Sequence, residues 1–220
     1  MPEPLTIVLG TRNKKKGAEI AALIARPWEP HPRLARLFAR TLDEWPDLPE
    51  VVEDTGTFAG NARKKAGETA RALRLWVVAD DSGLAVDALG GAPGVDSAIY
   101  AGTHGDDEAN NRLLLANIAE VPDERRGAAF VCTLALADPT GAIRLEAEGQ
   151  CRGRLIREPR GDHGFGYDPL FLIPEYHRTF GELSPLVKAQ LSHRSRAFAR
   201  LSIGLDRLIV SGEFDQPFAR

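Results

Sequence analysis

Two adjacent carboxylates, Asp80 and Asp81, follow an apolar stretch of the sequence. Residues 77–83 read V-V-A-D-D-S-G, so three apolar residues lead into the pair, and the serine and glycine after it favour a turn. Neighbouring anions repel each other, and a chain that keeps them usually supplies a cation. Because successive side chains of a strand point to opposite faces, we expect the two carboxylates to diverge, with Asp81 directed at the ligand. A structural role in the turn is the alternative for these acids.

A second acidic pair, Glu53 and Asp54, also comes directly before a turn-forming dipeptide, T-G. Carboxylate oxygens suit Mg²⁺, which keeps several waters and bridges to substrate phosphates instead of occupying a full protein cage. Lys65 lies on the helix expected to follow and could return a positive charge to the same place. The two acidic pairs therefore predict a magnesium site, with helix capping as the alternative for Glu53 and Asp54.

The segment T-R-N-K-K-K, which begins at Thr11, lies between an expected strand and an expected helix. Backbone N–H groups at a helix start attract anions, Thr11 and Asn13 carry hydrogen-bonding side chains, and Lys16 adds a full positive charge. The segment therefore predicts a small phosphate site. It is not the glycine-rich loop of G-x-x-x-x-G-K-[ST] form, and a solvated helix surface is the alternative for its lysines.

The sequence F-G-Y-D-P, which begins at Phe165, predicts a site for a flat ring. Phe165 or Tyr167 can stack on a purine, and Asp168 can hold a basic group or a ring N–H. Farther along, His193 and Arg194 supply donors that match the O6 oxygen of hypoxanthine or xanthine, whereas adenine would present an amino group to them. A structural turn is the alternative for the aromatic segment.

The elements that must position these residues follow from the spacing of apolar side chains. We expect strands at 5–10, 76–79, 130–137 and 143–151, and helices after residue 16, at 57–75, at 107–119 and at 193–210. Ser192 is a suitable cap for the last helix, and the D-P-T-G turn after residue 137 favours an antiparallel hairpin.

Helices that alternate with strands, together with one hairpin, predict an α/β fold on a mixed sheet rather than a purely parallel one. With 220 residues and 43% hydrophobic content, the chain is expected to form one domain, residues 1–220. Residues 84–106 contain G-G-A-P-G and little periodicity, which predicts an ordered loop. Residues 27–49 carry five prolines without a clean period, and we expect a surface excursion there.

Composition narrows the class of protein. The net charge is −3, with 28 basic and 31 acidic residues, and this balance argues against long polyanions such as DNA or RNA. Cys132 and Cys151 have neither C-x-x-C spacing nor the density of a disulfide scaffold, which favours buried thiols in a reducing compartment. The apolar run 5–9 is too short for a signal sequence or a membrane span. We therefore expect a soluble, cytoplasmic protein that binds neither nucleic acid nor membrane.

Seven short motifs occur in order along the chain. They are T-x-N-x-x-K at 11–16, E-[ED]-T-G-T-F at 53–58, N-A-x-x-K-A at 61–66, A-D-D-S-G-L at 79–84, L-G-G-A-P-G at 89–94, G-F-G-Y-D-P at 164–169 and S-H-R at 192–194. Together they resemble the inosine/xanthosine triphosphate pyrophosphatases. Enzymes of this family cleave a nucleoside triphosphate to the monophosphate and diphosphate.

The resemblance implies an elongated mixed β-sheet flanked by helices, two lobes around a central substrate cleft, a homodimer and Mg²⁺ as the cofactor. The implied substrates are ITP, dITP and XTP, whose hydrolysis cleanses the nucleotide pool. Asp81 would activate the attacking water, and Lys16 would neutralise charge on the diphosphate. Asp54, Asp81 and Glu53 would bind the metal. The implied substrate-binding residues are Thr11, Asn13, Lys16, Lys65, Ser82, Phe165, Gly166, Tyr167, Asp168, Lys188, His193 and Arg194.

The chain departs from the family pattern in places. Asp54 stands where glutamate is usual, so a shorter arm must reach the metal, and Gly60 replaces an acid commonly found before N-A. The segment 27–49 is longer than usual. Two alternatives stay open, a phosphatase that releases orthophosphate and a nucleotide-binding module without hydrolysis. The carboxylates argue against the module, because a pure binder has little need for negative charge beside bound phosphates.

Overall fold

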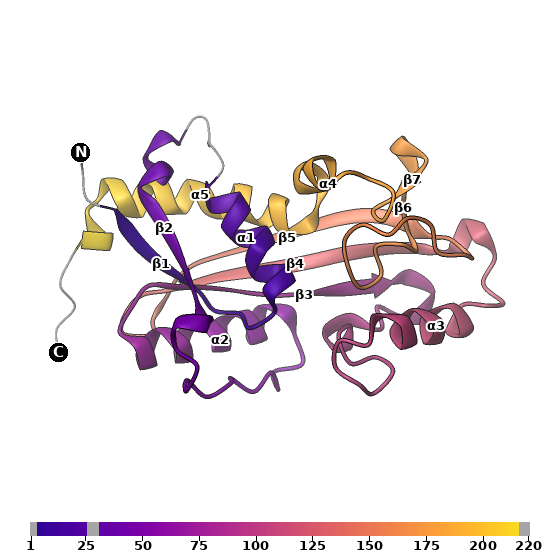
Figure 1. Ribbon diagram of the computed structural model, residues 1–220, viewed down its shortest axis with the longest axis horizontal. Helices are drawn as coiled ribbons and strands as arrows, with labels where there is room; N and C mark the ends of the chain where they lie inside the picture. Colours follow the sequence, from indigo (N-terminus) through magenta and orange to yellow (C-terminus); the bar gives the residue numbers. More distant parts are fainter. Residues whose placement is uncertain (1–3, 26–30, 216–220) are drawn as a thin grey trace. The chain divides into compact units, whose positions relative to one another are not determined.

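The computed structural model describes residues 4–25 and 31–215. Over these residues the chain forms five α-helices and one seven-stranded sheet of order β2-β1-β3-β4-β5-β6-β7 (Figure 1). The strands are β1 (Leu5–Leu9), β2 (Leu37–Thr41), β3 (Val77–Val86), β4 (Gly127–Ala137), β5 (Ile143–Leu155), β6 (Phe171–Ile173) and β7 (Arg178–Thr179). The helices are α1 (Lys14–Ala25), α2 (Phe58–Leu73), α3 (Asp107–Asn117), α4 (Pro185–Leu191) and α5 (His193–Val210).

The strand directions confirm the predicted α/β fold with a mixed sheet. β1 runs parallel to β2 and β3, whereas β6 runs antiparallel to β5 and β7. The hairpin is also confirmed, since β4 and β5 are neighbours and the Asp138 N–H donates to the Ala142 carbonyl oxygen at 3.0 Å. A sheet with both kinds of pairing needs both crossover helices and tight turns, and the chain provides both.

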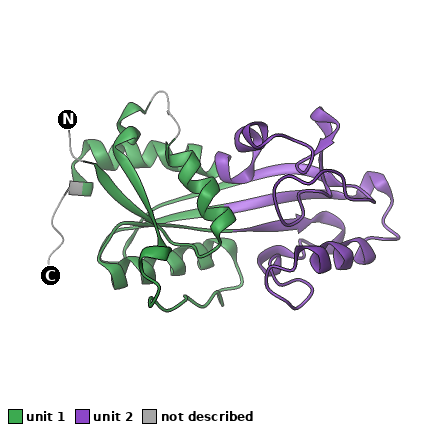
Figure 2. Cartoon of the chain, in the orientation of Figure 1, with its two compact units in different colours: residues 1–81, 133–149, 197–220 green, residues 82–132, 150–196 purple. Residues whose placement is uncertain are grey.

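The chain divides into two compact units (Figure 2). Unit 1 comprises residues 1–81, 133–149 and 197–220, and unit 2 comprises residues 82–132 and 150–196. β3, β4 and β5 contribute residues to both units. A single domain with two lobes stays a prediction.

In unit 1, small side chains of α2 pack on the sheet. Ala62, Ala66 and Ala70 recur at a spacing of four residues, are fully buried and belong to the same apolar cluster as residues 77 and 79 of β3. Alanine at these positions lets the helix backbone approach the strand closely. Thr57 caps α2, because its Oγ1 atom accepts a hydrogen bond from the Gly60 N–H at 3.0 Å. The start of α2 and its distance from β3 are therefore fixed.

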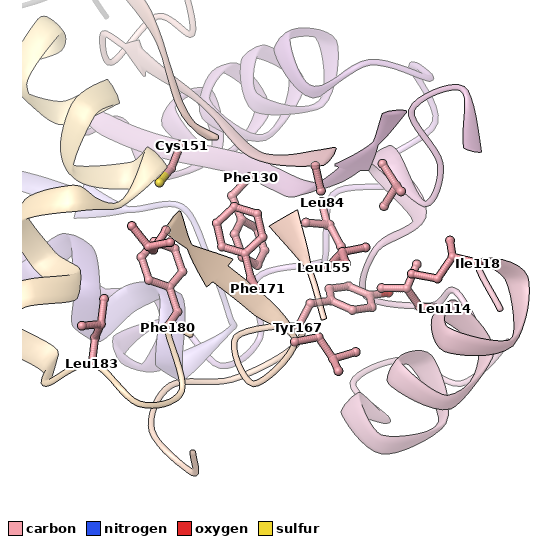
Figure 3. Close-up of a cluster of buried hydrophobic side chains, with 14 residues drawn as sticks. Leu84, Leu114, Ile118, Phe130, Cys151, Leu155, Tyr167, Phe171, Phe180 and Leu183 are labelled. Carbon is pink, nitrogen blue, oxygen red and sulfur yellow. The ribbon is translucent and has the colours of Figure 1, made fainter. Parts of the chain in front are cut away.

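In unit 2, aromatic rings fill the core (Figure 3). The ring of Phe130 lies with its centroid 4.6 Å from that of Phe171 and 6.0 Å from that of Phe180. Tyr167 and Leu114, from the aromatic segment and from α3, belong to the same cluster. Rings of this size bury a large apolar area each, so they hold short elements such as β6 in place.

The strand that carries the two acids is longer than predicted. The prediction ended it at the acidic pair with a turn at the following Ser-Gly, but β3 continues to Val86. A Cβ atom on Gly83 would lie 2.3 Å from the Gly94 carbonyl oxygen and 2.4 Å from Ser97 Oγ. The glycine therefore serves a close approach of two chain segments and not a turn. Asp80 and Asp81 lie within a strand.

Other predictions have mixed outcomes. α5 spans the predicted residues, and Ser192 Oγ caps it by accepting a hydrogen bond from the Ser195 N–H at 3.1 Å. The expected loop 84–106 instead contains the end of β3 and short 3-10 turns, and the expected excursion 27–49 contains β2. Residues 27–30 of that segment lie outside the described residues. No helix in the described part of the chain has the length and apolarity that crossing a bilayer requires.

Candidate active site

The start of α1 is built by the side chains predicted to bind phosphate. Thr11 Oγ1 accepts a hydrogen bond from the Asn13 N–H at 3.2 Å, and Asn13 Oδ1 accepts one from the Lys16 N–H at 3.1 Å. Asn13 therefore caps the helix. Lys14 and Lys15 are exposed, as the solvated-surface alternative requires, whereas Lys16 is half-buried. Of these lysines, Lys16 is the one turned toward a site.

Asp80 and Asp81 are both buried, with 0% and 4% of their surface exposed. Lys16 Nζ lies 3.9 Å from Asp80 Oδ2, and Lys65 Nζ lies 3.9 Å from Asp81 Oδ1. Each acid thus has a lysine that offsets the repulsion expected between neighbouring carboxylates. Lys65 also donates a hydrogen bond to Glu53 Oε2 at 2.8 Å. We call these residues, Lys16, Glu53, Lys65, Asp80 and Asp81, the carboxylate–lysine cluster.

Asn61 contacts Asp81 directly and is absent from the predicted site residues. Its Nδ2 atom donates to Asp81 Oδ2 at 3.0 Å, and its Oδ1 atom accepts from the Thr55 N–H at 3.1 Å and from Thr55 Oγ1 at 2.8 Å. A buried polar side chain must find such partners, so an asparagine on the apolar stripe of α2 is the signal that could have identified it. The departure at Gly60 has a local reason, because a Cβ atom there would lie 2.2 Å from Thr55 Oγ1.

Burial changes the protonation of this cluster. It raises the pKa of Asp81 to about 6, against the opposing effect of the two lysines. Burial also disfavours the charged form of Lys65, but the Asp80 and Asp81 carboxylates outweigh it and raise the pKa of that lysine. A carboxylate with a pKa near 6 is ionised at neutral pH and can still accept a proton efficiently. The cluster therefore contains a candidate general base beside a lysine that keeps its charge.

The second acidic pair is more exposed than the first. The Glu53 and Asp54 side chains have 42% and 61% of their surface exposed. Asp54 Oδ1 accepts a hydrogen bond from Lys64 Nζ at 2.6 Å, and this bond lowers the pKa of Asp54. The structure thus joins Glu53 to the cluster through Lys65 and pairs Asp54 with Lys64. The role of Asp54 in metal binding stays a prediction.

The chemistry of the cluster allows a particular kind of metal. Its donors are carboxylate oxygens, and among the residues described no three His, Cys, Asp or Glu side chains form a preformed metal site. Mg²⁺ commonly binds one or two carboxylates and takes its other ligands from substrate phosphates and water. Asp81 and its neighbours therefore fit a hard divalent cation that binds together with phosphates, and do not fit a soft metal.

The residues predicted to bind a ring lie in unit 2, where Phe165, Asp168 and Lys188 form the aromatic-loop cluster. Lys188 Nζ and the Phe165 N–H both donate to Asp168 Oδ2, at 2.6 Å and 2.8 Å. The same ammonium group lies 4.8 Å from the centre of the Phe165 ring. Asp168 and Lys188 are buried and Phe165 is half-buried. The cluster is therefore a tight ion pair beneath a partly accessible ring.

The two aromatic candidates for stacking have different surroundings. Tyr167 is 3% exposed, and its hydroxyl donates to the Ser97 carbonyl oxygen at 2.9 Å. Burial raises the pKa of Tyr167, so the hydroxyl stays a donor. Its ring belongs to the core in Figure 3. Tyr167 thus anchors the segment, and Phe165 is the better placed of the two to meet a ligand.

His193 and Arg194 begin α5 and are both buried, with 6% and 1% exposure. The His193 ring stacks on Phe130, with centroids 5.0 Å apart and planes 14° from parallel. Arg194 Nη2 donates to Ser82 Oγ at 2.8 Å, and Ser82 directly follows Asp81. The donors predicted for a purine oxygen are therefore held in fixed orientations by residues far away in the sequence.

Comparisons with known proteins agree with this chemistry. A family model described as the Ham1 family matches residues 7–203. A dITP/XTP pyrophosphatase of Rhodopirellula baltica is 54% identical over 205 residues, which cover 93% of this chain and 95% of the relative. The solved structure of a HAM1 protein from Coxiella burnetii has a TM-score of 0.80 at 38% identity and covers 92% of this chain and 99% of its own. The crystal structure of a nucleoside-triphosphatase, also named dITP/XTP pyrophosphatase, from Mycobacterium abscessus has a TM-score of 0.70 at 44% identity and covers 89% of this chain and 98% of its own.

Proposed function

Because this chain belongs to the Ham1 family, we propose that it hydrolyses the non-standard purine nucleoside triphosphates ITP, dITP and XTP to the monophosphate and diphosphate. Similar proteins are named dITP/XTP pyrophosphatase, and ITP carries the same base as dITP. The observation that carries the proposal is the buried Asp81 carboxylate, which Asn61 orients and Lys65 accompanies. This arrangement suits attack on a phosphate and serves no evident purpose in a protein that only binds nucleotides.

Asp81 is the general base in this proposal. Its carboxylate takes a proton from water as the water oxygen attacks the α-phosphorus, and the bond from that phosphorus to the bridging oxygen breaks, releasing diphosphate. A pKa of about 6 leaves Asp81 ionised at neutral pH. Lys16 and Lys65 offset negative charge that develops on the leaving group. Thr11 and Asn13 add hydrogen bonds to phosphate oxygens.

Asp81, Glu53 and Asp54 are the residues that would hold Mg²⁺, together with phosphate oxygens of the substrate. When bound, the cation would supply positive charge that neutralises the triphosphate as the bond breaks. Glu53 and Asp54 are exposed enough to turn toward an arriving nucleotide. Metal binding would compete with the contacts that Lys65 and Lys64 make to these two acids.

The aromatic-loop cluster is the candidate site for a purine base. Phe165 would stack on the purine, and Lys188, paired with Asp168, would help to hold the Phe165 ring through its contact with the ring face. His193 and Arg194 would direct N–H donors at the O6 oxygen, with Ser82 holding Arg194. An amino group at this position, as in adenine, would leave those donors unpaired and weaken binding.

We further propose that the protein acts in the cytoplasm as a homodimer. Cys132 and Cys151 are free and buried, and burial raises the pKa of Cys151 to about 11. Thiols of this kind persist in a reducing compartment. Sedimentation equilibrium tests the dimer against the chain mass of 23.9 kDa. A single species of one chain mass would reject it.

A substrate panel with separate detection of diphosphate and orthophosphate tests the proposed reaction. ITP, dITP and XTP should release diphosphate, and ATP should release little. The rate with GTP shows whether a 6-keto oxygen alone is enough for a purine triphosphate to be hydrolysed. Reactions with Mg²⁺, with Mn²⁺ and with EDTA establish the cation. Release of orthophosphate alone would establish the alternative phosphatase. Calorimetric binding of ITP without turnover would establish a nucleotide-binding module.

A further inference from the structure

Helix α3 holds the backbone of Gly166 from both sides. Asp107 Oδ2 accepts a hydrogen bond from the Gly166 N–H at 2.8 Å, and Asn111 Nδ2 donates one to the Gly166 carbonyl oxygen at 3.0 Å. Residues four apart on a helix lie on the same face, so the two side chains act as one two-point support. We call Asp107 and Asn111 the α3 clamp.

Gly166 is a residue whose conformation needs such a support. Its φ of +62° lies in the left-handed region, and a glycine reaches several other regions with similar ease. Hydrogen bonds at both its N–H and its carbonyl select one of these conformations. The α3 clamp therefore fixes the direction in which the chain leaves Phe165 and enters Tyr167.

The helix that carries the clamp is itself anchored near both ends. Asn110 is buried, and its Oδ1 atom accepts from the Ala101 N–H at 2.7 Å while its Nδ2 atom donates to the Ala98 carbonyl oxygen at 3.3 Å. After the last turn, the buried Arg126 donates from Nη2 to the Ile118 carbonyl oxygen at 2.7 Å. α3 is thus a firm base for the contacts to Gly166.

The residues on either side of Gly166 have anchors of their own. The Phe165 N–H donates to Asp168, and the Tyr167 hydroxyl donates to the Ser97 carbonyl oxygen. Together with the α3 clamp, these contacts define the backbone on both sides of the Phe165 side chain. A change at α3 would therefore move the Phe165 ring.

We propose that Asp107 and Asn111 are positioning residues for base recognition, because they hold the loop that presents the Phe165 ring to the purine. The inference rests on the proposed function and deepens it. Loss of either clamp contact should lower kcat/KM for ITP about 10-fold, mainly through KM, since the reaction itself takes place at the phosphates. Hydrolysis of a triphosphate without a base, such as ribose 5-triphosphate, should not change.

Matched pairs of variants on α3 test this inference. Asp107→Ala and Glu108→Ala each remove an acid from the first turn of the helix, where negative charge is favourable, but the Glu108 side chain is 83% exposed. Asn111→Ala and Asn117→Ala each remove an asparagine, and Asn117 is an exposed residue. We expect the two clamp variants to lose activity toward ITP alone, and the two controls to match the parent protein.

Equal kcat/KM for ITP in clamp variants and controls would overturn the inference and leave the proposed function standing. A parallel loss with ribose 5-triphosphate would overturn it as well, because it would indicate general damage to the enzyme. If a clamp variant does not fold, Gly166→Ala provides the second test, since its methyl group would meet nothing within 4 Å and strains only the backbone. It should show the same ITP-specific loss. Parent protein that cleaves none of these triphosphates would reject the proposed function itself.

Discussion

The two clusters hold their charges in different ways. In the carboxylate–lysine cluster, Asp80 and Asp81 each lie 3.9 Å from a lysine nitrogen, which is beyond hydrogen-bond distance. In the aromatic-loop cluster, Lys188 Nζ and Asp168 Oδ2 are 2.6 Å apart. A loose pair can take a phosphate or a cation between its partners, whereas a short pair is already satisfied. The first cluster also contains one short pair, Lys65 with Glu53 at 2.8 Å. From the loose contacts at Asp80 and Asp81 we infer that these two acids can receive charge, whereas the second cluster holds a shape.

The raised pKa of Asp81 also indicates that the carboxylate–lysine cluster can receive positive charge. The pKa of Asp81, raised to about 6 by burial, means that its ionised form is destabilised in the folded protein. A cation that binds beside it would relieve this destabilisation, so binding and stability are coupled there. The cluster is therefore stabilised by the same kind of group that the reaction needs.

The largest expected effect is on turnover. Asp81→Asn should lower kcat for ITP by about 10²–10⁴, because the amide cannot take the proton while its shape and its contact to Asn61 are retained. Asp54→Asn should lose only about 10-fold, because that side chain lies at an exposed position and pairs with Lys64. Diphosphate release, with circular dichroism as the check on folding, measures both. Normal turnover by Asp81→Asn would remove this residue from the mechanism.

The next largest effect should be on the stability of the protein, to which the tight pair should contribute more than the loose pair. Lys188→Met leaves Asp168 buried without its cation and should lower the free energy of unfolding by about 3–5 kcal/mol. Lys16→Met should lower it by only about 1 kcal/mol, because the pair is not hydrogen-bonded and Lys65 also interacts with Asp80. Urea denaturation of both variants in parallel measures the difference. Equal losses would mean that the two clusters do not differ as the distances indicate.

Local patterns predicted the parts of these clusters that local structure decides. The helical period of residues 193–210 gives α5, and the strand, turn and helix around Asn13 bring Lys16 to Asp80. Such features depend on neighbours within a few residues, which a sequence shows directly. The candidate metal donors and the candidate ring-binding residues could therefore be named before any fold was known, and their roles stay predictions.

Features that depend on distant partners could not be predicted in the same way. β2 is a five-residue strand in a proline-rich region and exists because it pairs in parallel with β1. Tyr167 has the same side-chain type as a stacking residue, but its bond to Ser97, 70 residues away, places it in the core. Asn61 and Thr55 likewise gain their roles from Asp81 on another element. Composition and spacing carry no information about these pairings.

The stability of the protein should depend on pH through Asp81. Its folded pKa of about 6 is above the usual 3.8, so this acid favours folding when protonated and opposes it when ionised. The parent protein should therefore lose about 2–3 kcal/mol of stability, relative to Asp81→Asn, as pH rises from about 4 to about 7. Urea denaturation in EDTA across this pH range measures the gap, which is the difference in free energy of unfolding between the parent protein and Asp81→Asn. A gap that does not change with pH would mean that Asp81 is not destabilised by burial.

The smallest effect should come from Asn61, which orients the general base Asp81 and has no assigned contact with phosphate. Asn61→Ala removes the donor to Asp81 and the acceptor for Thr55, and it should lower kcat about 10-fold with little change in KM. Asn61→Asp keeps the shape and the acceptor but places a second carboxylate against Asp81, so its kcat should be lower still. If Asn61→Asp were more active than Asn61→Ala, the shape of the side chain at position 61 would matter more for kcat than its donor to Asp81. Asp81 would then be positioned by packing, whereas hydrogen bonds position Asp168 in the aromatic-loop cluster.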